Sequence, residues 1–192
     1  MKFFRNNTHL ILRLFVNQIG ITFFALVLSM AVVSLDKPVF KLVVSIFSIL
    51  FYLCLIYSVM WEAGASNAVR IESGRMEKTP FFALKAALWA SVPNLFLGVL
   101  MTVFALIGVL GGVAWAAEGY GVMHIICGLF EAMFAGLFSA IIGPLSGTAK
   151  YMVVCILYLL SSLPMILVSI GSYELGKRNI ASLGKVRPKK NG

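Results

Sequence analysis

Two titratable residues, Glu131 and His124, lie inside an apolar stretch over residues 122–142. They are seven residues apart, so two turns of a helix would place both on one face, with Cys127 between them. A charged residue in the middle of a membrane costs about 2.5–3.5 kcal/mol on insertion scales, and such residues usually face a cavity or a partner. A protonatable carboxyl near an imidazole could relay protons or bind a cationic group. Glu131 is therefore the first candidate for a binding residue, with His124 as its expected partner.

One other interpretation of these residues stays open, and one is disfavoured. Glu131 could be structural, placed at the membrane interface or hydrogen-bonded to the backbone of a neighbouring helix. A zinc site of His124, Cys127 and Glu131 is disfavoured because the chain has no second cluster of ligands. The sequence contains no nucleophile elbow and no HExxH motif, and its scattered glycines form no phosphate loop. We therefore expect no enzymatic activity, no metal site and no cofactor.

Asn94 is the third candidate binding residue, and it directly follows Pro93 in an apolar stretch over residues 86–110. A proline inside a membrane helix leaves a backbone carbonyl without its donor. Ser91 and Asn94 flank this position and can satisfy the freed backbone groups. The sequence predicts that Pro93 interrupts the helix and that polar side chains gather there.

The composition places the chain among integral membrane proteins. Of 192 residues, 60% are hydrophobic and only 12% are charged, with a mean hydropathy of +0.97. The net charge of +9 is explained by basic residues retained on the cytoplasmic side, where they attract anionic lipid headgroups, and no nucleic-acid-binding motif accompanies it. Cys54, Cys127 and Cys155 are isolated in apolar runs, which indicates small buried side chains and not disulfides.

The order of apolar and polar segments predicts an all-α integral membrane protein with a single polytopic domain over residues 1–192. Four transmembrane helices are expected, with one re-entrant or interfacial helical segment, and five spans are the alternative. A basic N-terminal arm covers residues 1–13 and a basic cytoplasmic tail covers residues 177–192. The expected spans are residues 14–35, 41–61, 86–110 and 151–171, and the re-entrant or interfacial segment is 122–142.

Local signals place the ends of these elements. Asp36-Lys37-Pro38 is expected to break the chain after the first span, and Ser73-Gly74 is expected to form a turn in the polar stretch of residues 62–79. Thr79-Pro80 predicts a helix start, with threonine as the cap and proline at the first helical position. Pro164 is expected to kink the last span.

The distribution of the 16 basic residues decides between four and five spans. With five spans, eight basic residues lie on each side in either orientation, which violates the positive-inside rule. If residues 122–142 enter and leave on the outer side, both termini are cytoplasmic and 13 of the 16 basic residues lie inside. Two half-helices of about ten residues rise about 15 Å each, which is half of a membrane core. Gly128, near the midpoint, is the expected turn.

Three short motifs suggest a family resemblance. They are Trp61 and Gly64 followed by Gly74-Arg75, then Pro93-Asn94, and then Tyr173-Glu174-Leu175-Gly176-Lys177 before the basic tail. Together they cover about half of the chain, and the pattern resembles small, uncharacterised polytopic membrane proteins of Gram-positive bacteria. The resemblance implies a location in the bacterial plasma membrane and no known activity.

Two functions follow from these features. The first is a non-enzymatic membrane protein that associates with other membrane proteins, a second copy of itself, or lipid. The second is a small transport component or substrate-capturing subunit that uses the Glu131 and His124 region. Few polar residues lie in the predicted spans, which leaves little to bind a polar solute apart from Glu131, His124, Asn94, Asn17 and Gln18.

The charge distribution leads to a direct test of topology. We expect a reporter fused after Gly192 to be cytoplasmic, because only that arrangement keeps most basic residues inside. Alkaline phosphatase activity of such a fusion on the outer side would overturn the four-span topology.

Overall fold

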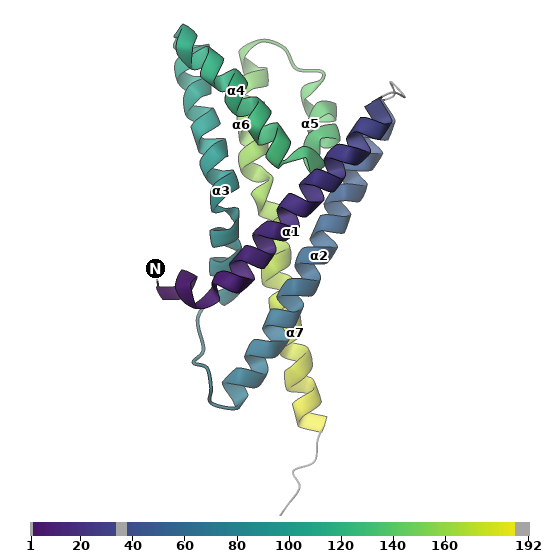
Figure 1. The fold of residues 1–192 in the computed structure, drawn as a ribbon, viewed down its shortest axis with the longest axis vertical. Helices are drawn as coiled ribbons and strands as arrows, with labels where there is room; N and C mark the ends of the chain where they lie inside the picture. The colour runs from purple at the N-terminus through teal and green to yellow at the C-terminus, as the bar shows by residue number, and fades with distance from the viewer. Residues whose placement is uncertain (1, 34–37, 187–192) are drawn as a thin grey trace, which may run out of the picture. The chain divides into compact units, whose positions relative to one another are not determined.

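The computed structural model describes residues 2–33 and 38–186, and within these ranges the regular elements are all helical (Figure 1). The Asp36-Lys37 break and the end of the basic tail, residues 187–192, lie outside the described residues. The elements in chain order are α1 Lys2–Val33, α2 Pro38–Glu72, α3 Phe82–Phe104, η1 Ala105–Leu110, α4 Ala114–Phe130, η2 Ala132–Phe134, α5 Ala135–Ile142, α6 Gly147–Leu160 and α7 Ser162–Val186.

Four of these helical stretches are long and apolar enough to cross a membrane, which confirms the predicted fold class. A fifth segment consists of two helices, Ala114–Phe130 and Ala132–Ile142, joined with a bend of 86°. In Figure 1, α4 runs inward from the end where η1 stops, and α5 returns toward that same end. The long stretches are Phe3–Ala31, Pro38–Glu72, Phe82–Leu110 and Gly147–Arg178.

The chain forms two compact units, whose boundaries fall inside helices. The first unit contains the chain up to Leu14, Leu53–Ala90 and the chain from Pro164. The second contains Phe15–Tyr52 and Ser91–Leu163.

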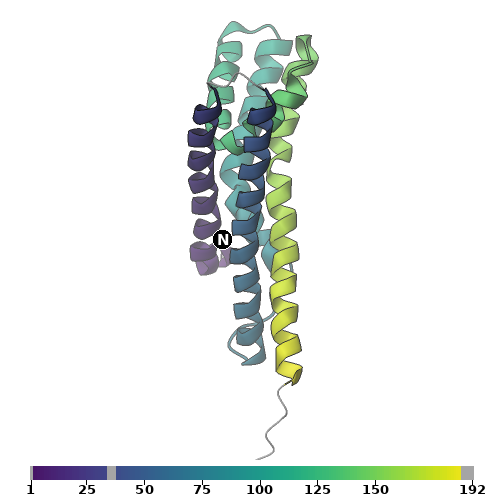
Figure 2. The ribbon, with the colours of Figure 1, turned by 90° about the vertical axis from the view of Figure 1, so that its right-hand side faces the viewer.

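The first unit is organised by a close approach of α2 and α7, which lie side by side in Figures 1 and 2. A Cβ atom added at Gly64 would overlap the backbone carbonyl of Tyr173, and one at Gly176 would overlap that of Trp61. Small residues allow such contact between helix backbones. Close packing drives helix association in a membrane, because lipid is as apolar as the helices and no hydrophobic effect acts between them. The Trp61 and Gly64 motif of α2 and the Tyr173–Lys177 motif of α7 thus pack against each other.

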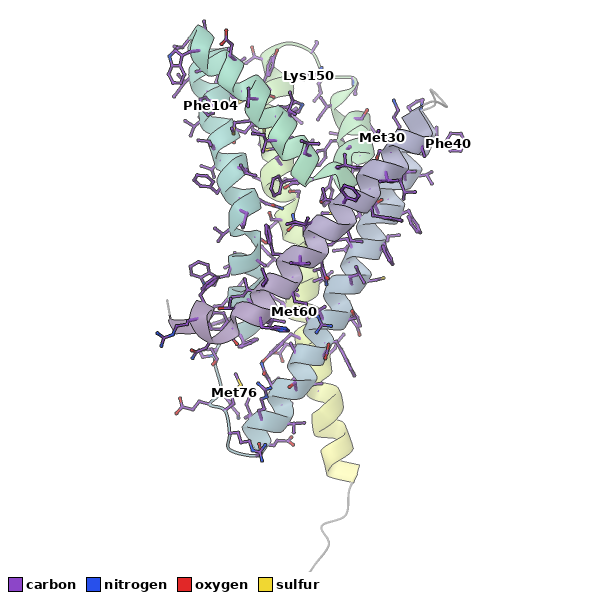
Figure 3. The ribbon with its side chains drawn as sticks, viewed as in Figure 1. Met30, Phe40, Met60, Met76, Phe104 and Lys150 are labelled. Atoms are coloured by element: carbon purple, nitrogen blue, oxygen red, sulfur yellow. The ribbon has the colours of Figure 1, made fainter. Side chains whose placement is uncertain are left out.

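A similar close contact lies in the second unit, between η1 and α4. A Cβ atom at Gly108 would overlap the backbone at Ala116 and Ala117, so η1 and α4 pack tightly where the chain turns back. Next to this contact, the rings of Phe104 and Trp115 meet edge to face, with centroids 6.2 Å apart. Phe104 is labelled on α3 in Figure 3.

The connection between α2 and α3 confirms one sequence prediction and corrects another. Gly74 has φ +71 in the predicted turn, with its N–H donated to the Ile71 carbonyl at 3.1 Å. The next helix, however, begins at Phe82 and not at Pro80. Phe81 has φ +54, which is not helical, and its carbonyl accepts the first helical hydrogen bond from Lys85 at 3.0 Å. Phe81 therefore occupies the N-cap position expected for Thr79.

The two prolines inside spans behave differently. Pro93 lies within the continuous helix α3, so the predicted interruption there is wrong. Near Pro164 the helix is interrupted at one residue, Ser161, between α6, which ends at Leu160, and α7, which begins at Ser162. Pro164 has no N–H to donate to the carbonyl of Leu160, four residues earlier, and the interruption lies at the next residue.

The glycine contacts predict a matched pair of effects in α7. Gly176→Ala should lower the thermal midpoint in detergent, because overpacking of this kind costs about 1–3 kcal/mol. Gly171→Ala is the control, since a Cβ there meets nothing within 4 Å and alanine favours a helix by up to about 1 kcal/mol. Equal midpoints for the two variants would contradict the close approach of α2 and α7.

Candidate functional site

The helical segment that carries the candidate residues breaks at Glu131. Its backbone has φ −120 and ψ 31, outside the helical range, and it follows the last residue of α4. Its N–H still donates to the Cys127 carbonyl at 2.9 Å, while the Phe134 N–H donates to the Glu131 carbonyl at 2.9 Å. One tight turn therefore replaces the regular helix, three residues beyond the Gly128 turn expected from the sequence.

Two backbone groups released by this break are satisfied by side chains of other helices. In a continuous helix the Phe130 carbonyl would accept from Phe134; here it accepts from the Thr22 hydroxyl at 2.8 Å. The Gly136 N–H, at the start of α5, donates to the Ser45 hydroxyl at 2.7 Å. Thr22 lies on α1 and Ser45 on α2, so both helices hold the broken segment through polar contacts inside an apolar bundle.

The carboxyl group of Glu131 is buried, with only 4% of the residue exposed. The side chains of Ser161, Tyr52, Tyr158 and Cys127 are close enough to interact with it electrostatically. Its Oε2 atom has no hydrogen-bond partner. Within residues 2–33 and 38–186 the ion pairs involve other acids, so no cationic side chain neutralises Glu131.

Ser161 is the single residue between α6 and α7. Its hydroxyl donates to the Tyr158 carbonyl at 2.6 Å. The backbone stays helical here, with φ −58 and ψ −25, and the Ser161 N–H donates to the Leu157 carbonyl at 2.9 Å. The sharp bend in this unit, of 86°, is the one at Glu131.

Several further polar side chains are buried in the same unit. Each of four residues from α1, α2, α3 and the start of α7 has a buried oxygen without a hydrogen-bond partner. These atoms are Gln18 Oε1, Ser48 Oγ, Asn94 Oδ1 and Ser162 Oγ. A buried polar group without a partner costs about 1–3 kcal/mol, so each of these atoms is a place where a ligand or a water could add a hydrogen bond.

His124 lies elsewhere and does not pair with Glu131. It is exposed on α4, stacked against Tyr120 at 5.9 Å and edge-on to Tyr158 at 5.8 Å between ring centroids. It lines a separate cavity of about 340 Å³ with Lys150, which Figure 3 labels at the start of α6. The expected shared face is lost because α4 ends at Phe130, and Glu131 leaves the helical spiral.

Asn94 is buried on α3 and makes no hydrogen bond to either of the other two candidates. The structure thus separates the three predicted residues and surrounds Glu131 with side chains that the sequence analysis did not select. A signal for part of this set was present: Ser45, Ser48 and Tyr52 recur at helical spacing in an otherwise apolar stretch. Ser161 and Thr22 carried no such pattern.

Among the described residues, no group of three or more histidines, cysteines and acids could hold a metal ion. The chain matches no family model, no curated protein and no solved structure.

The break at Glu131 predicts that Thr22 is a specific structural support. Thr22→Val should lower stability by about 1–3 kcal/mol, because it leaves the Phe130 carbonyl unsatisfied in an apolar setting. Thr102→Val is the matched control, since the Thr102 hydroxyl donates to the Gly98 carbonyl of its own helix at 2.7 Å. Thermal midpoints in detergent should fall for the first variant and stay near the parent for the second; the reverse order would contradict this role of Thr22.

Proposed function

We propose that this protein is a non-catalytic, multi-pass membrane protein that binds a proton or a single monovalent cation at Glu131 and works as a component of a transport system. The observation that carries this proposal is the coincidence of a helix break with a buried carboxyl that has one unpartnered oxygen. Broken helices at membrane depth place free backbone groups and a side chain where an ion can be bound.

The charge of the site supports a monovalent ligand. Glu131 is the only buried acid among the described residues, and no basic side chain neutralises it. A lone buried carboxylate is strongly destabilised, so it is either protonated or paired with a cation. One negative charge is balanced by one proton or one monovalent cation, whereas divalent cations usually take more than one carboxylate or keep several waters.

The neighbouring groups support binding that changes with occupancy. The Tyr52 hydroxyl can donate to an ionised carboxylate or accept from a protonated one, whereas the Ser161 hydroxyl, whose hydrogen goes to the Tyr158 carbonyl, can accept from the protonated form. A change in the state of Glu131 therefore alters hydrogen bonds at the turn that joins α4 to α5. Because α5 has only eight residues and its Gly136 N–H donates to Ser45 of α2, this helix is the element that such a change would shift.

The geometry favours the transport role over association with membrane proteins or lipid, the other function expected from the sequence. Association through helix surfaces requires no acid in the interior, and an ionisable group there costs about 2.5–3.5 kcal/mol on insertion scales. A site that retains this cost, with one carboxyl oxygen unpartnered, is better explained by a ligand that binds there.

The proposal includes a location in the bacterial plasma membrane, with both termini on the cytoplasmic side. The positive-inside rule supports this orientation for four spans and a re-entrant α4–α5 segment. The return of α5 toward the end where α4 begins, seen in Figure 1, agrees with such a segment.

Reaction with dicyclohexylcarbodiimide tests the site directly, because this apolar reagent modifies protonated carboxyls in membranes. We expect mass spectrometry of the full chain in detergent to find an adduct on Glu131 that decreases as pH rises. If a cation competes with the proton, Na⁺ or K⁺ at constant pH will decrease it further. In proteoliposomes, Glu131→Gln should abolish any proton or cation flux that the parent protein supports.

The matched control is Glu118→Gln, since Glu118 is exposed on the same helical segment and should not affect adduct formation. An adduct on Glu131 that changes with neither pH nor cations would contradict ion binding. So would an unaltered flux in Glu131→Gln.

A further inference from the structure

We propose a second site, independent of Glu131, in which Arg70, Arg75 and Lys85 bind the phosphate group of an anionic ligand. These cations line a cavity of about 590 Å³ in the first unit. Its walls come from the start of α1, the end of α2, the α2–α3 connection and the first turn of α3. Besides the three cations it is lined by Phe3, Asn6, Asn7, Asn67, Met76, Glu77 and Thr79.

The cavity has an excess of positive charge. Arg70, Arg75 and Lys85 are exposed, and none of them takes part in the ion pairs formed by the described residues. Glu77 is the only acid in the lining. Two other basic residues of this unit are neutralised: Arg13 binds Glu62 at 2.9 Å and Lys177 lies 3.4 Å from Glu174. Three cations without an ion pair thus line one cavity together with a single acid.

Neutral donors and the Phe3 ring, which belongs to an aromatic cluster, complete the site. Asn67 is buried and donates one amide hydrogen to the Tyr173 hydroxyl at 3.2 Å, which leaves its second hydrogen for a ligand. Tyr173 in turn stacks on Phe82, with ring centroids 5.2 Å apart, and Phe3 meets Phe82 edge to face at 5.3 Å. The Lys85 ammonium lies 6.0 Å from the Phe3 ring centroid, so the aromatic cluster also positions this cation.

Phosphate is the anion that this set of donors suits best. Guanidinium groups form paired hydrogen bonds with phosphate oxygens, and a lysine adds a mobile point charge. The asparagine amides supply neutral donors without adding acceptor charge. The shared chemistry is a phosphate ester, carried either by a phospholipid headgroup or by a soluble molecule.

A neighbouring cavity favours the lipid as the source. It measures about 640 Å³ and shares Met76 and Thr79 with the first cavity. Figure 3 labels Met76 on the connection between α2 and α3. Most of its wall is apolar, including Phe81, Leu84 and Ile170, with Lys78 and Lys177 among the exceptions. A polar, cationic cavity beside an apolar one matches a molecule with a phosphate head and an acyl chain.

Binding to the full-length protein in detergent tests the site. The probes are short-chain phosphatidylglycerol, short-chain phosphatidylcholine, glycerol 3-phosphate and oleate, each followed by the thermal midpoint and by a titration of intrinsic fluorescence. We expect phosphatidylglycerol to raise the midpoint, and Arg70→Gln or Arg75→Gln to weaken its binding about tenfold or more. Lys150→Gln, which removes an exposed cation from the second unit, should leave binding unchanged.

The probes separate the sources of the phosphate and the ways in which the proposal fails. Glycerol 3-phosphate binding that needs Arg70 and Arg75 would support the site and assign it to a soluble ester. Equal binding of oleate, or equal losses in Lys150→Gln, would show attraction to any negative amphiphile and overturn the phosphate site. Absence of binding by both phosphatidylglycerol and glycerol 3-phosphate would also overturn it. Ion binding at Glu131 is unaffected by either result, because Glu131 lies in the other unit.

Discussion

Backbone groups released inside an apolar bundle must find new partners, and this requirement organises the second unit. The break at Glu131 frees the Phe130 carbonyl and the Gly136 N–H, and Thr22 and Ser45 satisfy them. In water such groups could hydrogen-bond to solvent, but in hydrocarbon each unsatisfied group costs several kcal/mol. The polar side chains of α1 and α2 are therefore needed for the broken segment to exist at membrane depth.

The same requirement explains why a buried acid can be tolerated there. The Glu131 carboxyl interacts with the Ser161 side chain, and its Oε2 atom has no hydrogen-bond partner. Partial satisfaction is less stable than either a fully paired network or an apolar core. An arrangement of this kind is typical of positions where stability is given up for binding, which is the basis for assigning ion binding to this residue.

The first unit shows a different use of small and charged residues. Gly64 and Gly176 bring α2 and α7 into backbone contact, and Tyr173, whose carbonyl lies against Gly64, also directs its hydroxyl to Asn67. Tyr173 thus takes part in the helix packing and also accepts a hydrogen bond from Asn67, which lines the cationic cavity. A substitution that separates α2 from α7 would therefore disturb the Asn67 amide as well, which links the packing of this unit to its proposed phosphate binding.

The sequence by itself determined the helical membrane class, the four long apolar helices and the additional segment near residues 122–142. Hydropathy and the spacing of basic residues suffice for this, because the membrane requires every span to satisfy its own backbone hydrogen bonds. Glu131 could also be selected from the sequence, since an isolated acid in an apolar stretch is energetically unfavourable whatever surrounds it.

Only the tertiary structure decided where helices stop and which side chains meet. Seven-residue spacing placed His124 beside Glu131 on the assumption of an unbroken helix, yet α4 ends at Phe130 and the two residues separate. Pro93 was expected to break its helix and does not, whereas the helix near Pro164 is interrupted at one residue, Ser161. The turn at Glu131 depends on side chains from distant segments, because the Thr22 hydroxyl donates to one freed backbone group and the Ser45 hydroxyl accepts from the other. Local propensity contains no information about these partners.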